Sequence, residues 1–184
     1  MVKAERDFLL LYLAASRERL LNTVNGLTKE QTRFRAARDR WSVADCVEHV
    51  TIVEKAVLKK IQSMVLSQHQ PEPTATTPDD AILSGVSNRS PRCTAPAEAL
   101  PRRRWTEVGE LLRQFEAARE RSLRFVAVTQ SDLRAYFFAH PQFGELDCYQ
   151  WLLFLGAHAE RHARQADDVV ADAGFPRVAD SAAG

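Results

Sequence analysis

Hydrophobic positions recur every three to four residues along most of this chain, which is the period of an amphipathic helix. Four segments follow this pattern: residues 4–25, about 43–68, 106–129, and 147 to just before 174. Almost no stretch shows the alternation of a half-buried strand. The pattern therefore predicts an all-α chain with four main helices.

Local signals mark the ends of these helices. Gly26 and Gly174 follow the first and fourth segments, and Phe175-Pro176 prevents the last helix from continuing. Three pairs have capping-box spacing, in which an N-cap side chain and the third helical residue bond each other's backbone: Thr28 with Gln31, Ser42 with Asp45, and Asp147 with Gln150. The pair at 28–31 predicts a further short helical turn.

The third segment has an apolar side and a charged side. Val108, Leu111, Phe115 and Val126 share the side expected to be buried, and alternating Glu and Arg side chains are expected outside. After it, residues 135–139 could be extended. His140-Pro141 predicts a turn, because a residue before proline avoids the helical region.

A long crossover separates the second and third segments. Residues 69–104 contain six prolines and are expected to be irregular, with at most one helical turn near 79–83. This stretch contains five arginines: Arg89, Arg92, Arg102, Arg103 and Arg104. They fit a solvated loop, or a lid or anion-binding wall; the arginines at 33–40 leave the same choice between a solvated linker and an anion site.

Composition and charge narrow the class of protein. The 184 residues suffice for one domain, expected at 1–176 with a loose tail at 177–184. The net charge of +1 argues against nucleic acid as a partner. Residues 8–15 are apolar but too few to span a bilayer. Three widely spaced cysteines favour reduced thiols, so we expect a cytoplasmic protein without a membrane anchor.

The chemistry-bearing residues begin with His158 and His162. Four residues apart on a helix, they lie on one face and could bind a single metal ion. His49 lies on the second helix beside an apolar stripe, and it would face this pair if the two helices are neighbours. Three imidazoles with a position left for water would form a catalytic metal site. The alternative is three neutral core histidines with satisfied nitrogens.

Other residues are candidates for the surroundings of this site. Gln165 and Cys46 each lie one turn from a histidine, and Trp151 shares the face of His158. His140 is a weaker candidate because it lies on a loop. Asp45 is expected to be engaged in capping. Glu48 and Glu160 adjoin histidines but are expected to project outward, so no general base can be named.

These motifs together resemble the DinB-like proteins. The resemblance covers about residues 5–174 and rests on four stretches: Trp41-Ser42-Val43 with His49, His140-Pro141-x-Phe143-Gly144-x-Leu146, Trp151-x-x-Phe154, and His158-x-x-Arg161-His162-x-x-Gln165. It implies an antiparallel four-helix bundle, often dimeric, with a divalent metal held by His49, His158 and His162.

The resemblance also implies a range of functions. The first is a metal-dependent enzyme of the transferase or isomerase type that uses a low-molecular-weight thiol as cosubstrate. The alternatives are a hydrolase using metal-bound water and a non-catalytic metal- or ligand-binding bundle connected with stress. Zn or Ni is the expected ion, with Fe, Mn or Co also compatible, because imidazole ligands do not select among them. A small-molecule substrate and a homodimer are expected partners.

Overall fold

The computed structural model describes residues 1–67, 77–88 and 95–177. The elements follow in chain order: α1 (Lys3–Asn22), α2 (Lys29–Arg33), α3 (Val43–Ser67), α4 (Asp79–Ser87), the 3₁₀ turn η1 (Ala97–Ala99), α5 (Val108–Val128), the 3₁₀ turn η2 (Leu133–Ala135), β1 (Phe137–His140), β2 (Gly144–Asp147) and α6 (Cys148–Val170). The four long helices agree with the predicted segments to within a few residues. The prediction of the Arg89 and Arg92 region and of the tail beyond 177 lies outside the described residues.

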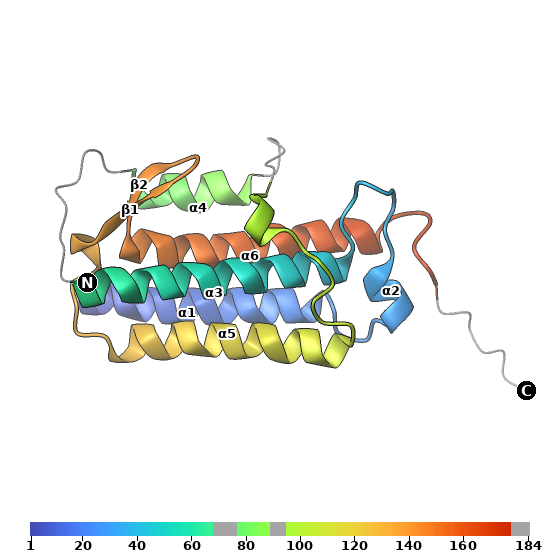
Figure 1. The fold of residues 1–184 in the computed structure, drawn as a ribbon, viewed down its shortest axis with the longest axis horizontal. Helices are drawn as coiled ribbons and strands as arrows, with labels where there is room; N and C mark the ends of the chain where they lie inside the picture. Colours follow the sequence, from blue (N-terminus) through green and yellow to red (C-terminus); the bar gives the residue numbers. More distant parts are fainter. Residues whose placement is uncertain (68–76, 89–94, 178–184) are drawn as a thin grey trace, which may run out of the picture.

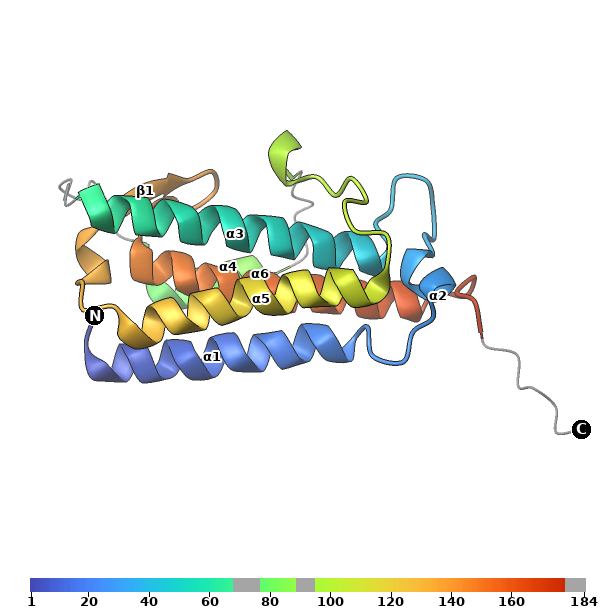
Figure 2. The ribbon, with the colours of Figure 1, turned by 60° about the horizontal axis from the view of Figure 1, so that its bottom comes forward.

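The four long helices form the four-helix bundle that the sequence predicts (Figure 1). α6 packs against α1 and α3, and α5 packs against the same two helices from the opposite side. α1 and α6 run in one direction, and α3 and α5 run in the other (Figures 1 and 2). The two helices of each parallel pair lie side by side. Two parallel helices need a long connection, which the residues between α3 and α5 supply.

Apolar side chains of all four helices fill the bundle interior. The core at one end contains Leu9, Leu13 and Leu152, and the core at the other contains Val47 and Phe115. α6 is the central element, since nearly every residue from Cys148 to Ala159 is buried. It is covered by α1 and α3 and also by α4.

The described part of the crossover contains more helix than the sequence indicates. The expected single turn near 79–83 is a nine-residue helix, α4, which lies along α6 (Figure 1). Ile82 and Val86, four residues apart, are its buried side chains. Beyond it, η1 and the irregular residues 100–107 cross α3 on the way to α5.

A short antiparallel hairpin precedes α6. β1 pairs with β2 between Phe137 and Asp147 at one end and between His140 and Gly144 at the other. Gly144 has a φ of +69°, a conformation that glycine adopts without strain. The sequence indicated extended residues near 135–139 but not the second strand. Asp147 then caps α6 by accepting from the backbone N–H of Gln150, as the capping-box pattern predicts.

The expectation that the arginines of the third helix all lie outside is wrong at Arg119. Its side chain is fully buried, and its guanidinium pairs with Glu54 of α3 at 2.7 and 2.9 Å. It also donates to the Ser16 hydroxyl and the Leu13 carbonyl of α1. Ser122 donates to the same carboxylate. This network links α1, α3 and α5 inside the bundle.

Within residues 1–67, 77–88 and 95–177, every helix falls short of the combined length and apolar character that a bilayer crossing requires.

Candidate metal centre

Three histidines from two helices meet inside the bundle. α3 supplies His49, and α6 supplies His158 and His162 from successive turns. One ring nitrogen of each histidine lies within 4.8 Å of the others, and His49 Nε2 is 3.1 Å from His158 Nε2. All three side chains are buried. The antiparallel packing of α3 on α6 therefore brings together the three residues that the sequence nominates.

Neighbouring acceptors fix the orientation of two of these rings. His49 Nδ1 lies 2.8 Å from the carbonyl oxygen of Ala99, and His162 Nδ1 lies 3.0 Å from Gln165 Oε1. Because an oxygen of this kind can only accept, each Nδ1 must carry the proton. The Nε2 atoms of both rings are then left with a lone pair, which is the form that binds a metal.

The cluster fits a metal ion in distance and in protonation. In a tetrahedral site with zinc-to-nitrogen distances of about 2.0–2.1 Å, ligand nitrogens lie roughly 3.3 Å apart. The 3.1 Å between His49 and His158 is close to that value. Burial lowers the pKa of His49 and of His158, and the other two histidines lower that of His158 further. Neutral imidazoles are the ligand form, so these residues could hold an ion.

Glu48 orders the chain segment that contacts His49. The expectation that Glu48 projects outward is wrong, because its carboxylate is buried. Its Oε1 accepts from the backbone N–H groups of Arg102 and Arg104 and from the Arg104 guanidinium. These bonds hold residues 97–104, here called the strap, against α3. The strap in turn supplies the Ala99 carbonyl that orients His49.

Aromatic rings surround the cluster on two sides. Trp41, just before α3, lies 4.8 Å from the His49 ring and stacks on His162 at 5.7 Å. Phe154, one turn before His158, stacks on that ring at 5.1 Å. In the sequence, Trp41 and Phe154 stand out only as parts of motifs. The position of Phe154 four residues before His158 is the signal that could have placed it beside the site.

His140 and Trp151 lie one layer farther out. The His140 ring contacts Phe154 and Trp151 at 4.8 and 5.0 Å. Its Nδ1 accepts from the backbone N–H groups of Gln142 and Phe143, so it organises the hairpin turn. Among the residues that the structure describes, only His49, His158 and His162 form a cluster with metal-binding geometry, and His140 is not a member.

The remaining candidates are engaged in the structure in different ways. Gln165 contacts His162, as described above. Asp45 accepts from the Ser42 backbone and pairs with Arg35, so its capping role is confirmed. Cys46 is a buried cysteine on α3. Glu160 is half-buried and lies near Arg164.

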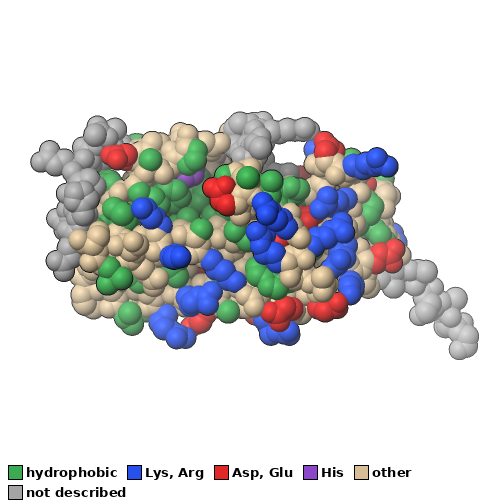
Figure 3. All heavy atoms as spheres, in the orientation of Figure 1, with side chains coloured by type: hydrophobic (Ala, Val, Ile, Leu, Met, Phe, Trp, Pro, Cys, Tyr) green, Lys and Arg blue, Asp and Glu red, His purple; other side chains and the backbone are tan. Residues whose placement is uncertain are grey.

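Basic side chains gather on the surface near the strap. In the space-filling view, Lys and Arg side chains cluster where the strap crosses α3 and where α2 lies beside it (Figure 3). Arg35 and Arg104 pair with buried carboxylates on α3, and Arg33 donates to the Thr106 carbonyl. Much of this charge is therefore used to attach connecting segments to the bundle.

Comparison with known proteins places this geometry in a family. The family model of the DinB superfamily matches residues 12–166, which contain all three histidines. The chain belongs to the DinB superfamily. The chain is also 22% identical over 148 residues to the uncharacterized protein YuaE of Bacillus subtilis strain 168, a match that covers 80% of this chain and 88% of that protein.

A solved structure shares the fold of this DinB-superfamily chain. YfiT from Bacillus subtilis is similar with a TM-score of 0.62 and 13% sequence identity, over 93% of this chain and 89% of YfiT. YfiT is described as a probable metal-dependent hydrolase with an unusual four-helix bundle topology. At this identity the likeness shows the fold.

Proposed function

We propose that this protein is a metal-dependent enzyme whose divalent ion is held by His49, His158 and His162. The observation that carries the proposal is the convergence of three buried imidazoles, two of which have the proton fixed on the outer nitrogen by Ala99 and Gln165. Core histidines with only a packing role have no need to bring one ring nitrogen each within 4.8 Å of the others, whereas a shared ion requires it.

Catalysis needs a free position on the ion. Within the part of the chain that the structure describes, no cysteine, carboxylate or fourth histidine joins the cluster. Three protein ligands are typical of catalytic zinc sites, whereas structural sites have four. A bound divalent ion would act there as a Lewis acid and would lower the pKa of a thiol or a water.

The leading reaction class is thiol-dependent transfer or isomerisation with a low-molecular-weight thiol. The family resemblance supports it, and so does the engagement of the nearby acids: Asp45 caps α3, and Glu48 binds the strap. Neither is free to serve as a general base for water. Trp41 and Phe154 would bind the apolar part of a substrate beside the ion and keep water away.

A hydrolase is the second candidate. The observation in its favour is the shared fold with YfiT, which is described as a probable metal-dependent hydrolase. A third possibility is a non-catalytic metal- or ligand-binding bundle. The family resemblance further leads us to propose a homodimer in the cytoplasm, for which sedimentation at several protein concentrations is the test of assembly.

Metal analysis of untagged protein, purified without a nickel column, is the first experiment. We expect about one divalent ion per chain, lost in the His158→Ala/His162→Ala variant and retained in the matched control His140→Ala, which removes a histidine outside the cluster. A parent that takes up none of Zn, Ni, Mn, Fe or Co when each is added would contradict the metal proposal.

Cobalt substitution then separates the three functional classes. A free position predicts that an added thiol produces a sulfur-to-cobalt charge-transfer band, and assays with electrophiles should show thiol-dependent turnover. Turnover of activated esters without thiol would support the hydrolase instead. A cobalt spectrum indifferent to thiols and to anions, with no turnover, would indicate a closed binding site.

A further inference from the structure

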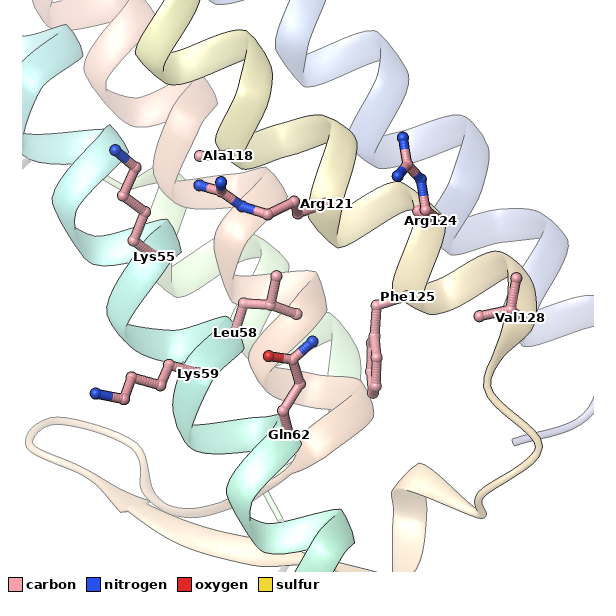
Figure 4. A pocket seen from close by; sticks show the side chains of 9 residues that line it. All are labelled: Lys55, Leu58, Lys59, Gln62, Ala118, Arg121, Arg124, Phe125 and Val128. Atoms are coloured by element: carbon pink, nitrogen blue, oxygen red, sulfur yellow. The ribbon is translucent and has the colours of Figure 1, made fainter.

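A groove lies between α3 and α5, and none of the three clustered histidines lines it. It has a volume of about 540 Å³, within the usual range for small-molecule pockets. One wall is formed by residues of α3 between Lys55 and Gln62, and the other by residues of α5 between 118 and 128 (Figure 4).

The walls of this groove carry cations only. Lys55 and Lys59 extend from α3, and Arg121 and Arg124 extend from α5 (Figure 4). No Asp or Glu lines the groove among the described residues. The chain as a whole is almost balanced in charge at +1, so four cations on the walls of one groove are a local concentration. Such a groove attracts anions.

Lys55 and Arg121 lie near each other at one end of the groove (Figure 4). Lys55 Nζ is 2.7 Å from Gln114 Oε1 and lies over the Trp105 ring at 4.9 Å, so its ammonium group is held in place. Partial burial and the nearby Arg121 charge lower the pKa of Lys55, while Glu110 acts in the opposite direction. Arg124 has a partner, an exposed Glu120 at 3.6 Å. In the described part of the chain, no carboxylate pairs with Arg121 or Lys59.

The floor and the other end of the groove are apolar. Leu58 and Ala118 form buried parts of the floor, and Phe125 and Val128 continue it toward the end of α5. Val128 is 65% exposed, so part of this apolar surface faces water. An apolar floor beneath a cationic end is complementary to a molecule with an apolar body and one anionic group.

We propose that this groove binds a small amphipathic anion, with its carboxylate or phosphate between Lys55 and Arg121 and its apolar body on Leu58 and Phe125. The anion relieves the repulsion between the two cations, and its apolar part covers surface that is otherwise exposed to water. This site is independent of the metal centre and of the function proposed for it.

Decanoate below its micelle concentration is the probe, and a ¹H–¹⁵N NMR titration of the full chain is the experiment. We expect saturable binding of one decanoate, with amide shifts in residues 55–62 and 118–128. Arg121→Gln should weaken binding about 10-fold or more, as expected for loss of a charge-assisted contact. The control Arg17→Gln removes the same charge from α1, outside the groove, and should change affinity less than about 2-fold.

Four results would overturn the proposal. Equal affinity for uncharged decanol would reduce the site to apolar surface. Binding lost in the His158→Ala/His162→Ala variant would place decanoate at the histidines. Shifts of the groove amides on protein dilution without ligand would show that a second copy of the chain covers this face. Absence of saturable binding would exclude the anion site altogether.

Discussion

Two buried polar clusters in the bundle differ in how their polar atoms are paired. The first is the ion pair of Arg119 with Glu54, where Ser16, Ser122 and the Leu13 carbonyl complete the hydrogen bonds. Every donor there meets an acceptor, and the opposite charges cancel. A cluster of this kind joins helices and leaves nothing for a ligand.

The histidine cluster is built in the opposite way. Its outer nitrogens are paired, with Ala99 and Gln165, but its inner nitrogens face one another across 3.1 Å between His49 and His158. Three ring nitrogens directed at one point are the arrangement that a metal ion requires. The comparison teaches that burial alone does not mark function, whereas ligand atoms directed at a common point do.

The largest effect is expected from breaking the ion pair of Arg119 with Glu54. Arg119→Ala leaves the Glu54 carboxylate buried without its partner, and we expect the free energy of unfolding to fall by about 3–5 kcal/mol, measured by urea denaturation. Replacing both partners, in Glu54→Leu/Arg119→Met, should recover at least half of the loss. If the double variant is no more stable than Arg119→Ala, desolvation of an unpaired charge is the wrong explanation.

A metal ion should stabilise the folded protein only through the histidine cluster. With the free ion at about 100 times its Kd, we expect the free energy of unfolding of the parent to rise by about 2.7 kcal/mol. The His158→Ala/His162→Ala variant should show no rise, and Glu54→Leu/Arg119→Met should show the full rise because its histidines are intact. Equal stabilisation of the histidine variant would place the metal elsewhere.

A smaller effect is expected from the residue that orients His162. Gln165→Ala removes the acceptor of the Nδ1 proton, and we expect metal affinity to fall about 10-fold, because outer partners of ligating histidines typically contribute that much. Competition with a chromophoric chelator measures this. Gln130→Ala, at an exposed position near the end of α5, is the control and should leave the affinity unchanged.

The smallest effect concerns His140, which belongs to neither cluster. Burial lowers the pKa of His140 to about 4, from an ordinary value near 6.5. The unfolded chain therefore binds a proton more readily in this interval, so His140 lowers stability progressively as the pH falls from about 6.5 toward 4. His140→Phe should flatten that part of the curve of unfolding free energy against pH. An unchanged slope would show that other groups cause it.

Local patterns sufficed for the helices and for part of the site. The i, i+4 spacing puts His158 and His162 on one face of any helix, and the pairs Thr28/Gln31 and Asp147/Gln150 cap helices in the structure as they do in the sequence pattern. These features depend only on neighbours within about one turn. The hairpin at 137–147 is not evident from the sequence, because the residues of β2 show no strong alternation of apolar and polar side chains.

The sequence by itself determined four amphipathic helices and the three histidines, because periodicity and spacing are properties of the chain. Only the tertiary structure decided which charged residues are buried. Arg119 and Glu48 are charged residues that the sequence predicts to lie outside, yet one pairs with Glu54 of another helix and the other binds a strap more than 50 residues away. Their burial is offset by partners distant in the chain, and such partners are brought together only by folding.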